Sequence, residues 1–278
     1  MENTSVISNT YTLIDNLDDL LDLEAIEHER TKEVFSAYTY NGIQIPRVTK
    51  IIDSVMNREY LITWALGLGK YGYYNEKDFA TSVGQKVHDL IEYYLQNGYK
   101  DKDVDYYRKS PRQAPVVERA YNNFKDWFEH LINTGNKFEL IGLEVPVSCP
   151  YYAGTIDCLC RINGATYILD FKTSKKISYE YILQVCAYKW IIDHGFMPEY
   201  NLHIDGIGII RVDKEICRNE DLFLNTFIPE QNHIIESFTL GFGSILSTFY
   251  QKINMEYEFN KYKKSYPGLL STLKGDKK

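Results

Sequence analysis

Three charged residues, Asp157, Asp170 and Lys172, are spaced so that their side chains are predicted to converge. Successive side chains of a strand point to opposite faces, so Asp170 and Lys172, two residues apart, point the same way. Two carboxylates this close repel each other, and a cation relieves that repulsion. Hard oxygen ligands of this kind suit Mg²⁺ or Mn²⁺. The alternative is a surface salt bridge between Asp170 and Lys172, because a D-x-K pattern alone is common.

A hairpin is predicted to bring Asp157 beside the other two residues. Residues 156–162 read as one strand and residues 166–173 as another, with Asn163-Gly164 between them. Asn-Gly is the strongest short hairpin signal, because a type I′ turn needs positive φ at both central residues.

Two helices are predicted to flank this hairpin in the sequence. After it, Ser178 is the expected N-cap of a helix on which Gln184 and Tyr188, four residues apart, share a face. Before it, residues 79–98 carry apolar side chains at helical spacing, with His88 near the edge of the stripe and Gly84 one turn earlier. A histidine at such an edge is more often an ordinary core or boundary residue, but the downstream motifs favour a site role for His88.

The four pieces together resemble the core of the PD-(D/E)xK nuclease superfamily, and within it the RecB-like exonuclease branch. That branch includes mitochondrial genome maintenance and phage exonucleases. It carries Gly-x-x-x-His on a helix, Gly-x-x-Asp and Asp-x-Lys on strands, and Gln-x-x-x-Tyr on a helix. This chain has all four in order, from Gly84 to His88, Gly154 to Asp157, Asp170 to Lys172, and Gln184 to Tyr188. The combination is far more specific than any one motif.

The resemblance implies an α/β fold with a restriction-endonuclease-like core. Its element order would be αβββαβ, with a central mixed sheet flanked by helices and extra helices at both ends of the chain. The expected parts are an acidic helical segment (1–36), a nuclease domain (37–258) and a basic tail (259–278). Within the nuclease domain we expect a helical layer (45–134), a catalytic sheet core (138–213) and C-terminal helices (219–258).

The resemblance also implies roles for single residues. The metal, Mg²⁺ or Mn²⁺, would be held by His88, Asp157, Asp170 and the carbonyl of Phe171. Lys172 would orient or help deprotonate the attacking water and stabilise the developing charge.

Further residues are expected near the metal. Gln184 and Tyr188 would hold the DNA strand or the geometry of the site, and Lys175 and Lys176 add positive charge for DNA beside it. Related nucleases often carry a glutamate on the strand over residues 138–148, which makes Glu144 a further catalytic candidate. Its alternative role is a solvated charge on an edge strand.

Composition excludes several classes of protein. The 278 residues carry a net charge of −7 with 44% hydrophobic residues, which is unlike a protein that coats nucleic acid but compatible with a local basic site. No apolar run is long enough for a membrane helix and the N-terminus lacks the features of a secretory signal, so a cytoplasmic protein is expected. No iron–sulfur cluster of the kind found in some RecB-like nucleases is expected, because no cysteine follows Cys217.

The sequence therefore predicts a Mg²⁺-dependent DNA exonuclease or single-strand nuclease in recombination, replication or repair, encoded by a phage or mobile element. Its partner would be DNA that is single-stranded or has a free end. Two alternatives stay open. One is a nuclease-fold module that binds nucleic acid or protein without cutting, against which the intact Asp157, Asp170 and Lys172 argue. The other is a restriction-type endonuclease on the same fold.

Overall fold

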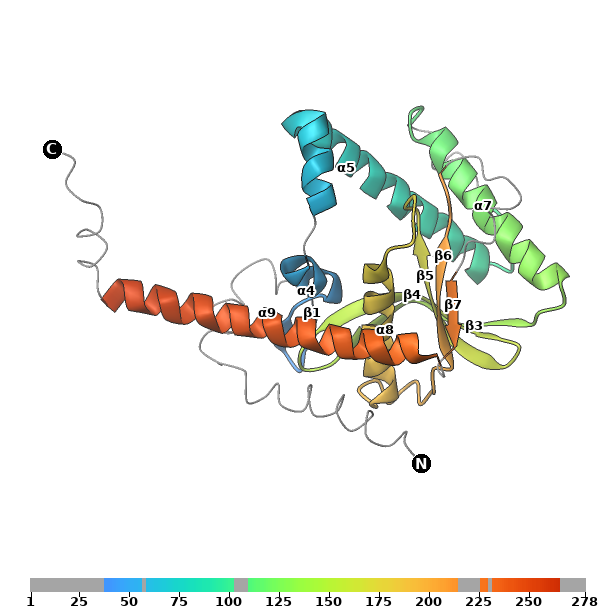
Figure 1. Cartoon of the computed structure of the whole chain (residues 1–278). Helices are drawn as coiled ribbons and strands as arrows, with labels where there is room; N and C mark the ends of the chain where they lie inside the picture. The colour runs from blue at the N-terminus through green and yellow to red at the C-terminus, as the bar shows by residue number, and fades with distance from the viewer. Residues whose placement is uncertain (1–37, 57–58, 103–109, 215–225, 230–231, 266–278) are drawn as a thin grey trace. The chain divides into compact units, whose positions relative to one another are not determined.

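The computed structural model describes residues 38–56, 59–102, 110–214, 226–229 and 232–265 (Figure 1). The chain divides into two compact units. The larger, here called the sheet unit, comprises Asn57–Val147 and Gly154–Phe238. The smaller, the hairpin unit, comprises Met1–Met56, Ser148–Ala153 and Thr239–Lys278. The domain boundaries expected at residues 36 and 258 stay predictions.

A five-stranded mixed sheet is the centre of the sheet unit. Its strands lie in the order β3 (Phe138–Ser148), β4 (Ala153–Ile162), β5 (Ala165–Lys172), β6 (Gly206–Arg211) and β7 (Thr226–Pro229). β4 and β5 are antiparallel, β5 and β6 are parallel, and β6 and β7 are antiparallel. The strand β7 lies within residues 219–258, where C-terminal helices were predicted, and its four residues extend the sheet.

The predicted hairpin is confirmed as β4 and β5. Asn163 and Gly164 have φ angles of 53° and 89°, as a type I′ turn requires. The turn sets the register, which runs from the pair Ile162 and Ala165 to the pair Cys158 and Leu169.

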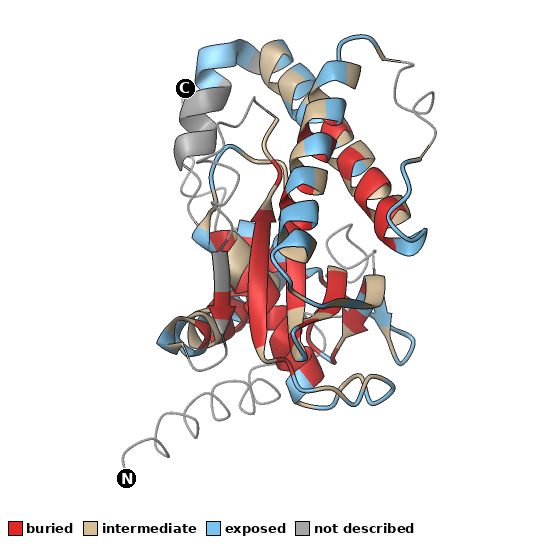
Figure 2. Ribbon diagram, turned by 90° about the vertical axis from the view of Figure 1, so that its right-hand side faces the viewer, coloured by how far each residue is buried: buried red, intermediate tan, exposed pale blue. Residues whose placement is uncertain are grey.

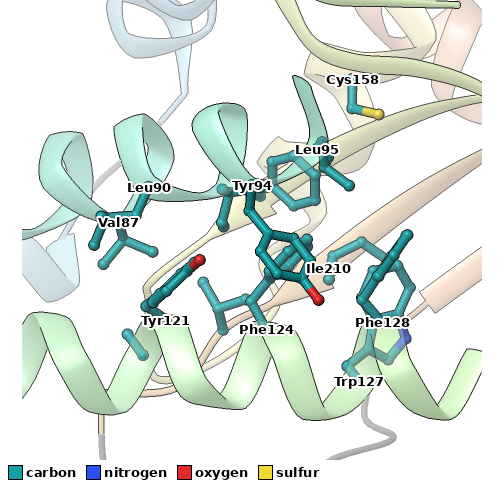
Figure 3. Packing of buried hydrophobic residues seen from close by; sticks show 14 of the residues in the cluster. Val87, Leu90, Tyr94, Leu95, Tyr121, Phe124, Trp127, Phe128, Cys158 and Ile210 are labelled. Carbon is teal, nitrogen blue, oxygen red and sulfur yellow. The ribbon is translucent and has the colours of Figure 1, made fainter. Parts of the chain in front are cut away.

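Two helices, α5 (Glu59–Gln96) and α7 (Ala114–Asn133), pack against one face of the sheet (Figures 1 and 3). The strands present alternate residues to this face, among them Cys158, Leu169, Phe171 and Ile210. α5 changes direction at Gly69, whose φ of 66° and ψ of 168° are not helical. The apolar side chains of the two helices and the strands form one buried cluster, which fixes the position of α5 on β5.

The helix α8 (Tyr179–Asp193) joins β5 to its parallel neighbour β6 and packs against both strands. Ser178 is its N-cap, as predicted, and accepts a hydrogen bond from the backbone N–H of Glu180. Most of α8 is buried. The strands β5 and β6 are also largely buried, and the centre of the sheet is red in Figure 2. The α/β class and the mixed sheet flanked by helices are thus confirmed and are compatible with a nuclease-like core. The match to the αβββαβ topology of the superfamily stays a prediction.

The hairpin unit contains β1 (Tyr38–Tyr40), β2 (Ile43–Ile45), α4 (Val48–Val55) and most of α9 (His233–Ser265). Segment 148–153 is held there by the bond from Ala153 N to the Pro46 carbonyl, 3.0 Å, and from the Tyr250 hydroxyl to the Tyr151 carbonyl, 2.6 Å. α9 continues to Ser265, so the chain is still helical in the first part of the predicted tail. The predicted acidic segment, residues 1–36, lies outside the described residues. None of the described helices is long and apolar enough to cross a membrane.

The aromatic centre of the cluster leads to the first prediction. Phe124 of α7 is 0% exposed, stacks on Phe128 and meets the ring of Phe171 edge-on at a centroid distance of 5.5 Å. Phe124→Ala should lower the free energy of unfolding by about 3–5 kcal/mol, because it leaves a cavity that the sheet cannot fill. Urea unfolding followed by circular dichroism measures this loss.

Tyr71→Ala is the matched control, because Tyr71 is an aromatic residue of α5 that is 83% exposed. Tyr71→Ala should change the free energy of unfolding by no more than about 0.5 kcal/mol. A loss below about 1 kcal/mol for Phe124→Ala would contradict the packing described here.

Candidate metal centre

The candidate centre lies at one edge of the sheet, where the antiparallel pairing of β4 with β5 stops, at Asp157 of β4 and the last residues of β5. The ladder between them stops at Cys158 and Leu169. Beyond it, the backbone N–H of Phe171 donates to the Asp157 carboxylate at 2.7 Å. The Asp157 side chain therefore accepts a hydrogen bond where the backbone ladder has stopped. This bond holds Asp157 against the end of β5.

His88 reaches this point from α5. Its Nε2 lies 2.8 Å from the carbonyl oxygen of Phe171, and its Nδ1 lies 3.7 Å from Asp157 Oδ2. When Nε2 carries the proton and donates to the carbonyl, the lone pair of Nδ1 is left for a cation. Metal-binding histidines commonly donate their other N–H in this way. Gly84, one turn earlier, has ordinary space around it, since an added Cβ would lie 3.4 Å from Thr173 Oγ1.

Glu144 comes to the same place from β3, by a distortion of the strand. Its φ of 47° is left-handed, which is strained for a residue with a side chain. Two residues earlier, a Cβ on Gly142 would lie only 2.7 Å from a methyl group of Val145, so the strand is bent over these positions. Bends of this kind re-aim side chains beside functional sites. Ligand atoms of His88, Glu144 and Asp157 all lie within 4.8 Å of one another.

The buried Asp170 and the half-buried Lys172 form an ion pair next to this group. Lys172 Nζ donates to Asp170 Oδ1 at 2.7 Å and lies 5.0 Å from the ring centre of Tyr181. Burial raises the pKa of Asp170 to about 6; the Lys172 ammonium opposes that rise and the Asp157 carboxylate adds to it. Burial lowers the pKa of Lys172, but Asp170 and Asp157 raise it by more, so Lys172 is held in its charged form.

Two observations support a metal ion at this place. Asp170 is 2% exposed, and its Oδ2 has no hydrogen-bond partner among the described residues, although a buried carboxylate oxygen normally needs one. Partial loss of hydration and the nearby Asp157 raise the pKa of Glu144, so negative charge is crowded at this edge. Carboxylate oxygens are the ligands that Mg²⁺ and Mn²⁺ prefer.

The predicted residues are only partly gathered. His88 and Asp157 come together as predicted, and Glu144, predicted to be catalytic, joins them. Asp170 stands beside this group and is not part of it. The Phe171 carbonyl, predicted as a ligand, faces His88.

The predicted DNA-binding residues differ in exposure. Lys175 and Lys176 are exposed in the loop after β5. Gln184 and Tyr188 are only 9% and 4% exposed, and Gln184 Nε2 donates to the Tyr188 hydroxyl at 3.1 Å. All four DNA contacts stay predictions.

Arg211 is a residue of this region that the sequence did not reveal. It is the partner of Lys172 in the parallel ladder between β5 and β6. Its guanidinium donates to the Lys175 carbonyl at 2.7 Å and pairs with Asp213 at 2.8 Å. Arg211 thereby fixes the loop that carries both exposed lysines. Only the strand register reveals this, because the two segments are far apart in the sequence.

Glu144 gives a prediction about metal binding. Mn²⁺ should raise the melting temperature of the wild-type protein, by about 2–4 °C for each kcal/mol of binding free energy. Glu144→Gln and Glu144→Gly should both reduce this shift, because both remove a negative ligand. Without metal, Glu144→Gly should melt no lower than the wild type, since glycine adopts a left-handed backbone without strain. Thermal unfolding with and without MnCl₂ measures both effects.

Glu139→Gln is the control on the same strand, since Glu139 pairs with Arg161 at the surface. It should leave the Mn²⁺ shift unchanged. An unchanged shift in Glu144→Gln would remove this residue from the centre.

Comparison with known proteins finds a weak similarity to a protein named as an exonuclease. No family model matches the chain. Over 170 residues the chain is 24% identical to mitochondrial genome maintenance exonuclease 1 of Homo sapiens. The match covers 54% of this chain and 44% of the human protein, so the chain spans less than half the length of that relative.

Proposed function

We propose that this protein is a metal-dependent DNA nuclease of the PD-(D/E)xK type, similar to the RecB-like exonucleases. The observation that carries the proposal is the convergence of His88, Glu144 and Asp157 beside the ion pair of the buried Asp170 with Lys172. The weak similarity to a human exonuclease supports a nuclease role independently of this geometry. Phosphodiester hydrolysis is the reaction that such a set of groups suits best.

Four residues would bind or face the cation. His88, Glu144 and Asp157 would hold the cation, and the free oxygen of Asp170 would face it. A bound Mg²⁺ or Mn²⁺ would lower the pKa of an attacking water and polarise the phosphoryl oxygen. Asp157 is kept in place by the Phe171 N–H, and the position of His88 is fixed by the Phe171 carbonyl.

Lys172 would act as a donor of hydrogen bonds and positive charge. Its ammonium is held by Asp170, and the raised pKa of Lys172 keeps the proton on it at neutral pH. A charged group of this kind orients a water molecule and stabilises negative charge that develops on the phosphate. This assignment favours the charge-stabilising part of the predicted role over proton abstraction.

The DNA strand would approach over the loop that follows β5. Lys175 and Lys176 are exposed there, a few residues after Lys172, and Arg211 holds their backbone. The net charge of the chain is −7, so positive charge in this loop matters more than the overall balance. The substrate that we propose, by resemblance to the exonuclease branch, is a single strand or a duplex with a free end.

The test of the proposed function compares wild-type protein with Asp170→Asn and Lys172→Ala. With Mg²⁺ and end-labelled single-stranded and linear double-stranded DNA, both variants should lose about 10²–10³-fold or more of the cleavage rate. The loss follows from removing an acceptor beside the metal or a donor to the transition state. Lys137→Ala, which removes an exposed lysine outside the site, should cleave at the wild-type rate.

The other outcomes separate the alternatives. Cleavage by either variant within tenfold of the wild type would place the chemistry elsewhere. Metal and DNA binding without any cleavage by the wild type would favour a non-catalytic module. Efficient linearisation of a relaxed, covalently closed circle would favour a restriction-type endonuclease.

The two loop lysines give a separate prediction about DNA binding. If each contacts one phosphate, Lys175→Ala with Lys176→Ala should reduce the slope of log affinity against log salt by about 1.4 for single-stranded DNA. Fluorescence anisotropy without divalent ions measures this slope while no cleavage occurs. Replacing Lys100 and Lys137, both exposed outside the loop, is the matched control. Equal slopes for the two double variants would remove Lys175 and Lys176 from the DNA path.

A further inference from the structure

We propose that Gly154, Gln184 and Tyr188 form one steric unit that positions Asp157, and that neither Gln184 nor Tyr188 contacts DNA. The consequence for cleavage rests on the proposed nuclease function. The consequence for metal affinity does not, because it is measured without DNA.

The first observation is the contact between Gly154 and the ring of Tyr188. A Cβ added at Gly154 would lie 2.2 Å from Tyr188 Cε1, 2.5 Å from the hydroxyl oxygen and 2.6 Å from Cζ. Real carbon atoms approach to about 3.5–4.0 Å, so any side chain here must displace the ring or the strand by more than about 1 Å. Gly154 is not among the residues with positive φ, so the requirement for glycine is space and not backbone conformation.

The second observation is that the ring has little room to move. Tyr188 is 4% exposed, and its hydroxyl accepts a hydrogen bond from Gln184 Nε2 one turn earlier on α8. Gln184 is itself buried. Buried polar groups of this kind hold each other in place, because breaking the bond leaves an unsatisfied group. Both side chains are therefore occupied within the protein.

The third observation is that this contact lies close to the candidate metal centre along β4. Asp157 follows Gly154 by three residues on the same strand, and the Phe171 N–H holds the Asp157 carboxylate. Tyr188 thus supports β4 at Gly154, three residues before Asp157. The N–H of Phe171 on β5 holds the Asp157 carboxylate itself. An outward shift of β4 at Gly154 would move this carboxylate relative to His88, and such outer contacts typically change metal affinity by about 10–100-fold.

A double-variant experiment tests the steric unit. Gly154→Ala should weaken Mn²⁺ binding by about 10–100-fold, measured by isothermal titration without DNA. Tyr188→Leu removes the ring atoms that an alanine methyl would meet. Adding G154A to Y188L should therefore weaken Mn²⁺ binding by less than about threefold, a strong departure from additivity. Equal losses from G154A in the wild-type and Y188L backgrounds would overturn the proposal.

A variant that fails to fold also gives an answer. If G154A alone does not fold, G154A/Y188L should fold and bind Mn²⁺ about as well as Y188L. If Y188L folds and the double variant does not, the proposed contact is wrong. Gly67→Ala is the matched control, because an added Cβ at Gly67 meets nothing within 4 Å. It should leave both folding and Mn²⁺ affinity unchanged.

A further pair of readouts separates positioning from DNA contact. Tyr188→Phe keeps the ring and removes the hydroxyl, so it should change Mn²⁺ affinity by less than G154A and leave KM for DNA unchanged. A raised KM with wild-type Mn²⁺ affinity would show a DNA contact and overturn the proposal. If the protein cleaves no DNA at all, the proposed function fails, while the Mn²⁺ titrations still decide the steric unit.

Discussion

The backbone of Phe171 is the point on which the candidate centre depends. Its N–H donates to Asp157, its carbonyl oxygen lies at hydrogen-bond distance from His88, and its ring packs against Phe124 in the core. One residue of β5 therefore links a strand, a helix and the apolar cluster to the site. The clustered side chains of α5 and α7 do more than stabilise the fold, because they set the distance between His88 and the two strands.

Negative charge is crowded at the centre, in an arrangement that a cation would relieve. Asp170 is buried next to Asp157, and this raises its pKa to about 6 although Lys172 is bonded to it. The left-handed backbone of Glu144 adds strain at the same edge of the sheet. These features cost stability in the protein alone, and a bound cation would offset part of that cost. Local rules that fail together in this way are expected at functional sites.

Local signals predicted the hairpin and the start of α8, but they did not reveal features that depend on distant parts of the chain. Asn163-Gly164 and Ser178 act through their own backbone, so their roles are readable in a few residues. The strand β7 was not predicted, because its four residues are too few to show an alternating pattern. They form a strand because they pair with β6. For the candidate site, the motifs predicted His88, Asp157, Asp170 and Lys172, and the structure brings His88 and Asp157 together with Glu144. The backbone of Glu144 was not predictable, since its bend depends on the packing of β3.

The burial of Gln184 and Tyr188 shows why motif spacing and motif role are separate questions. Spacing put the two residues on one face of α8, which is correct, but it did not show whether that face meets solvent or the protein. The contact with Gly154 supplies the missing information, because only a glycine allows the ring to lie on β4. On this view a glycine in one motif and a tyrosine in another are two halves of a single contact. The glycine leaves room for the tyrosine ring, and the ring in turn holds the strand at the glycine. Together they position Asp157, the last residue of the Gly-x-x-Asp motif.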